Sequence, residues 1–400
     1  MSADMLPMSI RQLHYQHTAP VYLETGGRFD SITVAYQTWG VLNSRKDNAV
    51  LVLHAFTGDT AVTSNSVGDS YPVPRGWWET YVGPGKPIDT DRWFVVAPNV
   101  LGGCAGTTGP SSPAPDGAVY GSRFPRITIR DQVSVEALLT NHLNIERYAL
   151  VAGGSMGGMR VLEWCLMFPD RVAAAWVGVS GAFTTAEQIA LHTLQIQAIM
   201  NDPNWCGGDY AAAGVFPAAG LGFARRLALL SYRTEDEFAL RFARDVQPGE
   251  NPWASTPMRN VGEEGYRFAV QGYLDYQASK LVKRFDAGTY VVLADAMMTH
   301  DVGRGRGGVA HALNTVTTPM TVTGVRSDRL YPLRLQQQIV DLVPTAEPLH
   351  VMDALQGHDS FLLPDDGLAE MLRRTLKKTT TRRGGVPQPA GNVNCPPPCR

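Results

Sequence analysis

The amino-acid sequence predicts an α/β protein with a mostly parallel, doubly wound sheet and a helical insertion. Short continuous apolar runs, typical of strands buried on both faces of a sheet, alternate with segments of helical periodicity. The expected strands are 31–37, 49–55, 93–97, 147–152, 172–180, 319–325 and 348–353. The expected helices between them include 130–142, 157–168 and 332–342. No repeat of fixed period is present, which argues against a solenoid.

The interval 183–300 breaks this alternation, because its apolar residues recur at helical spacing over a long stretch. We therefore expect a core domain of residues 16–182 and 301–378 that carries a helical lid insertion, residues 183–300. Residues 1–15 show little pattern and are expected to form a mobile N-terminus. Residues 379–400 are rich in Gly, Pro and polar side chains, which predicts a disordered tail.

The composition is that of a soluble globular enzyme, with 400 residues, 44% hydrophobic and 18% charged. A net charge of -2 gives no general attraction to nucleic acid or to a membrane surface. We find neither a signal-peptide pattern nor an apolar run of about 18 residues, so a cytoplasmic location is expected. Five scattered cysteines argue against a disulfide framework. The CPPPC pair near the end lacks the ligands of a zinc cage, so no metal is expected.

Residues 153–157 read Gly-Gly-Ser-Met-Gly and stand between a predicted strand and a predicted helix. In this context the pattern G-x-S-x-G is typical of a nucleophile elbow, a strained turn that tolerates only small neighbours around the serine. The alternative is a glycine-rich turn whose serine caps the helix. The strand before it and the helix after it favour Ser155 as a nucleophile.

A serine hydroxyl needs a base, and the base needs an acid that orients it. Asp328 follows the predicted strand 319–325, and His358 follows the strand 348–353. Both therefore fall at strand ends, in the order serine, acid, histidine that accompanies this elbow. The sequence predicts a triad of Ser155, Asp328 and His358.

The other histidines fit this pattern less well. His300 is the strongest competitor as base, but it precedes Asp328 and would reverse the expected order. His350 lies inside a strand pattern, and His192 lies on a predicted helix of the insertion, where packing roles are more common. His54 belongs to a different part of the site.

The segment LVLHAFTGD leaves its strand at His54 and turns through Phe56 to Gly58. It resembles the loop that supplies one oxyanion-hole amide in α/β-hydrolases, where the residue after the nucleophile supplies the other. We assign these backbone amides to Phe56 and Met156. A plain β-turn with a capping threonine is the alternative for the first segment.

Several long motifs together resemble the homoserine O-acetyltransferases of the α/β-hydrolase fold, most closely the actinobacterial type. They occur in order over roughly residues 20–375 and include WFVVAPNVLGGCAGTTGPSS, GGSMGGMRVLEW, THDVGRGRGG, RSDRLYPLRLQQQ and GHDSF. The resemblance implies a ping-pong reaction in which acetyl-CoA acetylates the serine and the hydroxyl of L-homoserine then accepts the acetyl group, for methionine synthesis. It also implies a homodimer, and acetyl-CoA as a co-substrate with no permanently bound cofactor.

The resemblance further implies that Arg225 and Asp359 bind the carboxylate and the ammonium of homoserine. Taken alone, Arg225 would be read as a solvated helix residue, whereas Asp359 adjoins His358 and must lie near the acyl centre. Homoserine O-succinyltransferase, serine O-acyltransferase, deacetylcephalosporin C acetyltransferase and esterase activities stay open, as does a catalytically silent binding protein. Arg329 is a candidate for donor choice. The GRGRGG segment at 303–308 is either an anion-binding loop or a tight structural turn.

Overall fold

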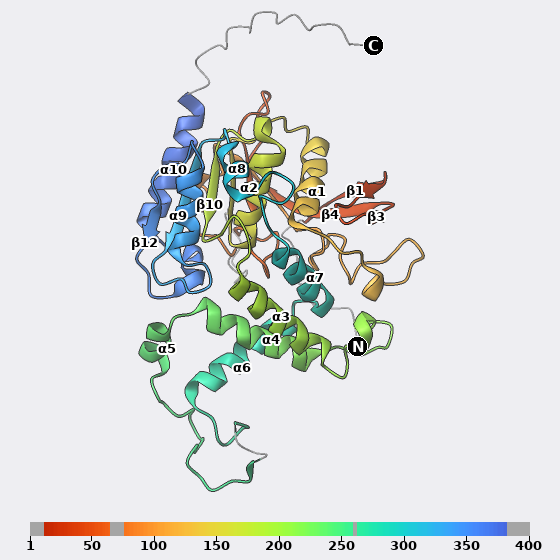
Figure 1. Cartoon of the computed structure of the whole chain (residues 1–400), viewed down its shortest axis with the longest axis vertical. Helices are drawn as coiled ribbons and strands as arrows, with labels where there is room; N and C mark the ends of the chain where they lie inside the picture. Colours follow the sequence, from red (N-terminus) through yellow and green to blue (C-terminus); the bar gives the residue numbers. More distant parts are fainter. Residues whose placement is uncertain (1–11, 65–75, 259–261, 382–400) are drawn as a thin grey trace, which may run out of the picture.

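The computed structural model describes residues 12–64, 76–258 and 262–381. Its centre is an eight-stranded sheet in the order β1-β4-β8-β5-β9-β10-β11-β12 (Figure 1). The pairs β1–β4 and β4–β8 are antiparallel, and the remaining neighbours are parallel. The strands are β1 Leu13–His17, β4 Ile32–Trp39, β5 Ala49–Leu53, β8 Phe94–Pro98, β9 Leu150–Gly154, β10 Ala175–Gly178, β11 Met320–Val325 and β12 His350–Met352. Two small sheets pair β2 Val21–Tyr22 with β3 Arg28–Phe29 and β6 Val82–Gly83 with β7 Ile88–Asp89.

Both faces of this sheet are covered, which explains why its strands read as continuous apolar runs. Because successive side chains of a strand alternate between faces, Leu51 and Leu53 of β5 share one core with residues of α1, α2, α8 and α9. Val50 and Val52 point the other way and share a second core with α10 and Trp78. The helices of these two layers are α1 Ile129–His142, α2 Met156–Met167, α8 Val309–Asn314, α9 Leu333–Leu342 and α10 Asp366–Thr381.

The remaining α-helices all fall within the expected insertion, residues 183–300. They are α3 Ala186–Met200, α4 Ala218–Tyr232, α5 Glu235–Phe242, α6 Ala269–Val282 and α7 Ala287–Met298. Figure 1 shows α3, α4, α5 and α6 gathered at one end of the sheet, below it in this view. Short 3₁₀ segments lie at Gly121–Arg123, Pro169–Arg171, Cys206–Gly208 and Gly357–Leu362.

The predicted α/β class is confirmed, and two differences from the expected bounds lie at the ends of the chain. Leu13–His17, partly inside the expected mobile N-terminus, forms the edge strand β1, which pairs with β4. This strand alternates half-buried and exposed residues, so it lacks the continuous apolar run by which the other strands were predicted. Helix α10 continues through Thr381, into the expected tail. The rest of both expected ends, 1–11 and 382–400, lies outside the described residues. Within the described ranges, no helix is long and apolar enough to cross a membrane.

Candidate functional site

Ser155 occupies the sharp turn between β9 and α2, with φ 56° and ψ -124°. A positive φ is strained for any residue with a Cβ, and it persists only where the surroundings hold it. Here the Ser155 N–H donates to the Gly178 carbonyl at 2.9 Å, and the Ser180 hydroxyl donates to the Ser155 carbonyl at 3.0 Å. The turn is thus fixed from β10 and the residues after it, as a nucleophile elbow requires.

The glycines around Ser155 are needed because neighbouring atoms fill the space of a side chain. A Cβ at Gly153 would lie 2.6 Å from the carbonyl of Gly157, and a Cβ at Gly157 would lie 2.2 Å from the Leu53 carbonyl oxygen. At Gly154 the obstacle is the Phe361 ring, 2.5 Å away. These contacts are closer than real Cβ atoms adopt, so the small residues of GGSMGG let α2 start directly beside the ends of β5 and β9.

The side chains of Ser155, His358 and Asp328 are in hydrogen-bond contact. His358, in the 3₁₀ segment after β12, places Nε2 2.9 Å from Ser155 Oγ and Nδ1 2.7 Å from Asp328 Oδ2. The other Asp328 oxygen accepts the N–H groups of Leu330 and Tyr331 at 2.8 and 2.9 Å. A carboxylate only accepts here, so Nδ1 of His358 carries a proton and Nε2 is left to accept the serine proton.

The environment of His358 favours its protonated form. Burial lowers the pKa of this imidazole, but the adjacent Asp328 carboxylate and, further down in order of effect, Asp359 outweigh burial, so the pKa lies above its ordinary value. Tyr331 stacks on the ring at a centroid distance of 5.1 Å. Such a shift suits a base that must hold a proton during the reaction and then give it back.

The competing histidines lie elsewhere. His300 is buried, with its Nε2 3.2 Å from the Gly181 carbonyl, and burial lowers its pKa to about 4. His192 is also buried, with its pKa lowered to about 4 by burial, and it packs edge-on against Phe56. His350 contacts Asp365 across 3.3 Å. None of these three lines the cavity that contains Ser155.

That cavity has a volume of about 510 Å³ and opens beside Ser155 and His358. Its lining residues are Ala55, Phe56, Thr57, Gly58, Asp59, Ala61, Trp77, Ser155, Arg225, Tyr232, Arg284, His358, Asp359, Phe361 and Leu362. Both predicted substrate-binding residues, Arg225 and Asp359, are among them. Within the described part of the chain, the buried Nε of Arg225 has no hydrogen-bond partner.

Asp359 is not free of partners, since its Oδ2 lies 3.1 Å from Nη2 of Arg233. Sequence reasoning missed this partner, and it also missed Arg284 and Asp59 of the cavity wall. Arg284 donates to the Thr57 carbonyl at 2.9 Å. Tyr232 lies beneath the Arg225 guanidinium at 5.7 Å from the ring centroid. Asp59 belongs to the predicted HAFTGD loop, but Arg233 and Arg284 carry no sequence signal.

The two predicted oxyanion-hole residues lie at the required chain positions. Phe56 lines the cavity in the loop after β5, and Met156 is the first residue of α2, where a helix leaves its N–H without an internal partner.

Other sequence candidates lie outside the cavity wall. Arg329 is exposed and is not among the described residues that line the cavity. In the GRGRGG segment, Arg304 pairs with Glu24 at 2.8 Å and Arg306 with Glu163 at 2.7 Å. A Cβ at Gly303 would lie 2.2 Å from the Val309 nitrogen. These contacts agree with a tight structural turn.

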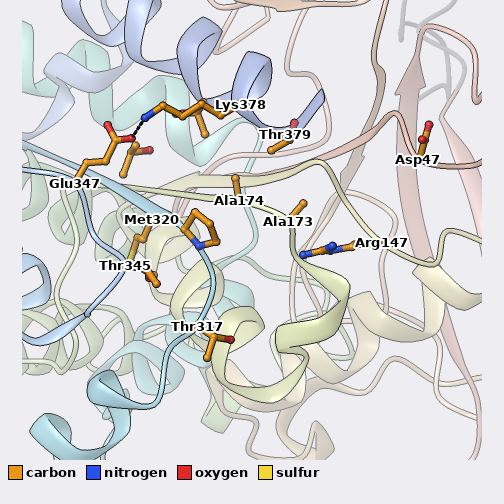
Figure 2. A pocket seen from close by; sticks show the side chains of 13 residues that line it. Asp47, Arg147, Ala173, Ala174, Thr317, Met320, Thr345, Glu347, Lys378 and Thr379 are labelled. Carbon is orange, nitrogen blue, oxygen red and sulfur yellow. Dashed lines mark hydrogen bonds and ion pairs between the residues drawn. The ribbon is translucent and has the colours of Figure 1, made fainter. Parts of the chain in front are cut away.

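A second cavity of about 550 Å³ lies at the amino ends of the parallel strands, opposite to Ser155 (Figure 2). Figure 2 shows Glu347 and Lys378 directed toward each other, and their ion pair measures 2.5 Å. No histidine, cysteine or serine is among its described lining residues. The cavity beside Ser155 is therefore the candidate active site. Among the described residues, no group of three or more His, Cys, Asp or Glu is arranged to hold a metal ion.

The sheet order, the elbow and the Ser155–His358–Asp328 contacts define a protein of the α/β-hydrolase fold. In agreement, the family model of the alpha/beta hydrolase fold matches residues 48–364. The homoserine O-acetyltransferase of Mycobacterium sp. (strain KMS) is 51% identical over 90% of this chain and 93% of its own length. That of Thermobifida fusca (strain YX) is 52% identical over 89% and 91%. The chain belongs to the homoserine O-acetyltransferase family.

Solved structures share the fold at lower identity. The homoserine O-acetyltransferase from Bacillus anthracis has a TM-score of 0.82 at 23% identity, covering 92% of this chain and 98% of that one. Esterase E22 has a TM-score of 0.80, also at 23% identity, covering 92% and 99%. Because a transferase and an esterase are nearly equally similar in shape, the fold alone does not separate transfer from hydrolysis.

Proposed function

We propose that this chain transfers the acetyl group of acetyl-CoA to the side-chain hydroxyl of L-homoserine through an acyl-enzyme on Ser155. The observation that carries the proposal is the presence of Arg225 and Asp359 in one cavity with the Ser155–His358 pair. An amino-acid acceptor brings one carboxylate and one ammonium, and Arg225 and Asp359 offer one group of opposite charge for each. Membership of the family supports the same activity.

In the first half-reaction, His358 Nε2 takes the proton of Ser155 Oγ while the oxygen attacks the thioester carbonyl. The Phe56 and Met156 amides are proposed to stabilise the resulting oxyanion. Collapse of this tetrahedral intermediate breaks the carbon–sulfur bond, and His358 gives the proton to the departing CoA thiolate. Asp328 keeps the imidazole in the required tautomer and stabilises its charged form.

In the second half-reaction, the homoserine hydroxyl attacks the acetyl-serine carbonyl while His358 takes its proton, and His358 then returns a proton to Ser155 Oγ. We propose that Arg225 binds the homoserine carboxylate and Asp359 its ammonium. The ammonium would share Asp359 with Arg233, which already balances this carboxylate. Binding by these two charged groups would hold the homoserine hydroxyl close to the acetyl-serine carbonyl, so that it reacts in preference to water.

The insertion helices are proposed to act as a lid. Helix α4 contributes Arg225 and Tyr232 to the cavity wall, and the segment between α6 and α7 contributes Arg284. The same helices expose large apolar side chains, including Phe223 at 54% and Leu230 at 47%, one stripe of α4 at i and i+7. We propose that this surface forms a homodimer. Since CoA thioesters are intracellular metabolites, we also propose a cytoplasmic location.

The test is a matrix of steady-state assays that measure free CoA and acylated product. Acetyl-CoA and succinyl-CoA are each combined with homoserine, serine or water alone, with Ser155→Ala as the inactive control. The proposal predicts sustained CoA release over many turnovers only when acetyl-CoA and homoserine are both present. Equal release without an amino acid would identify an esterase, and preference for succinyl-CoA or serine would identify another acyltransferase.

A further inference from the structure

His54, at the end of β5, is buried and hydrogen-bonded through both ring nitrogens. Its Nε2 lies 3.1 Å from the Val100 backbone nitrogen and 3.2 Å from Asn99 Nδ2, while its Nδ1 lies 2.8 Å from the Ala55 carbonyl oxygen. A backbone N–H only donates and a carbonyl only accepts. The ring is therefore the tautomer that accepts at Nε2 and donates from Nδ1 to Ala55.

The surroundings keep this ring neutral. Burial, and after it the positive charge of Arg160, lower the pKa of His54 to about 3, although the hydrogen bond to Ala55 works in the opposite direction. His54 therefore does not exchange a proton near neutral pH, and its contribution must come from fixed hydrogen bonds.

These hydrogen bonds determine where the next amide points. The Ala55 carbonyl accepts a second bond, from the Gly58 N–H at 2.9 Å, which closes a turn over residues 55–58. In a trans peptide the C=O and the following N–H point in opposite directions within one plane. Fixing the Ala55 oxygen with two donors thus fixes the Phe56 N–H on the other side. Residues 55–58 all line the cavity beside Ser155.

We propose that His54 is a positioning residue, whose Nδ1–H holds the Ala55 carbonyl and so directs the Phe56 N–H to the oxyanion of the acyl intermediate. This inference rests on the proposed function, because it assigns that oxyanion to an acyl group on Ser155. It adds the side chain that orients the Phe56 amide.

Arg160 connects this loop to the nucleophile elbow. Its guanidinium, fully buried in α2, donates to the His54 carbonyl and also to Glu136 Oε1 at 2.5 Å. Glu136 accepts a further bond from Trp164 Nε1 at 2.8 Å. The contact of Gly157 with the Leu53 carbonyl lies in the same region. The two segments that carry Phe56 and Met156 are thereby held at a fixed separation.

The closeness of Gly58 to the ring supports a tightly fitted site for His54. A Cβ at Gly58 would lie 2.9 Å from His54 Cβ and 3.2 Å from both His54 Nδ1 and the Ala55 oxygen. A side chain at this position would press on both partners of the hydrogen bond. The loop sequence HAFTG therefore contains the donor, the acceptor, the directed amide and the glycine that leaves room for them.

The test compares two amide replacements that keep different halves of the imidazole. In His54→Asn the amide N–H₂ lies near the former Nδ1 and still donates to Ala55. In His54→Gln the amide reaches the former Nε2 and still accepts from Val100, but no donor faces Ala55. His300→Gln is the matched control, because it also changes a buried histidine with a backbone partner, outside the cavity wall.

Two readouts are measured: steady-state kinetics with acetyl-CoA and homoserine, and the rate at which a p-nitrophenyl alkylphosphonate inactivates Ser155. The phosphoryl oxygen of that reagent occupies the oxyanion position. We expect His54→Gln to lower kcat and the inactivation rate together by about 10²-fold, the effect of losing one oxyanion donor, with little change in the homoserine KM. His54→Asn should stay within about tenfold of the wild type, and His300→Gln should match it.

The inactivation rate should fall over the same pH range in all folded variants, since His358 is not altered. Equal losses in His54→Asn and His54→Gln, or an unchanged inactivation rate in His54→Gln with a normal melting temperature, would overturn the inference. The phosphonate reacts without either substrate. The predicted ranking of the inactivation rates of the His54 variants can therefore hold even if the acceptor is not homoserine. A wild-type protein that the phosphonate does not inactivate at Ser155 would instead reject the proposed function.

Discussion

Asp359 Oδ2 lies 3.1 Å from Arg233 Nη2, in the wall of the cavity that holds Ser155. The carboxylate proposed to receive the substrate ammonium is thus already part of an ion pair, and both side chains keep 20% of their surface exposed. This ion pair orients the Asp359 carboxylate while it leaves part of the side chain accessible to a second cation.

Replacement of Asp359 by Asn should weaken homoserine binding more than acetylation of the enzyme. We expect the KM for homoserine to rise at least about tenfold, the effect of losing a charged hydrogen bond of about 1.5 kcal/mol or more. The rate of CoA release in the first turnover should change only a few-fold. The matched control is Asp353→Asn, which removes an exposed carboxylate paired with Arg326 just before the same loop.

Acylation should depend on a group that titrates above pH 6.5, because the pKa of His358 is raised above that value. Protonated His358 does not accept the serine proton, so the acylation rate is expected to fall as the pH is lowered through this pKa. Asp359→Asn removes one of the two carboxylates that raise the pKa of His358. In this variant the fall in the acylation rate should therefore occur at lower pH. Single-turnover acylation rates of the wild type and of Asp359→Asn, measured from pH 5 to pH 9, test both predictions. If the acylation rate of Asp359→Asn falls over the same pH range as in the wild type, the pH dependence does not arise from His358.

Gly157→Ala should disrupt the junction between α2 and β5, because its Cβ would meet the Leu53 carbonyl oxygen at 2.2 Å. A backbone atom cannot turn aside as a flexible side chain can, so a loss of about 3 kcal/mol or more is expected. Gly222→Ala in α4 is the control. Its nearest contact is the flexible end of Arg226 at 3.3 Å, and alanine in place of glycine favours a helix. Thermal melting compares the two variants, and equal melting temperatures would refute the packing argument.

The apolar stripe of α4 should mediate self-association. Phe223→Glu with Leu230→Glu places two charges on the exposed stripe, and we expect dimerisation to weaken by a factor of 10 or more. Val41→Glu is the control, since Val41 is 81% exposed in the loop between β4 and β5. Sedimentation velocity at several concentrations distinguishes monomer from dimer. A wild type that is monomeric at micromolar concentration would refute the proposed dimer.

The arrangement of Ser155, Asp328 and His358 could be predicted because each residue follows a strand that the sequence marks clearly. Parallel strands bring their carboxyl ends to one edge, so the order along the chain already predicts proximity there. The contacts of 2.9 Å between Ser155 and His358 and of 2.7 Å between His358 and Asp328 agree with the predicted proximity.

The partners that the sequence did not predict depend on how the insertion packs. Arg233 lies directly after α4, and its contact with Asp359 joins residues from separate parts of the chain. Helix periodicity gives the buried face of α4, but it does not give the direction of its axis over the sheet. Strand β1 was missed for a related reason, since an edge strand with one half-buried face lacks a continuous apolar run.

The central claim is that Ser155 carries the acetyl group covalently after CoA leaves and before homoserine accepts it. Rapid mixing with acetyl-labelled acetyl-CoA alone, followed by acid quenching and peptide mass analysis, tests it most directly. We predict a burst of CoA matched by acetyl on Ser155, and quantitative transfer to O-acetylhomoserine when homoserine is added. CoA release that requires homoserine, with no acetyl on Ser155 at any time, would contradict this account.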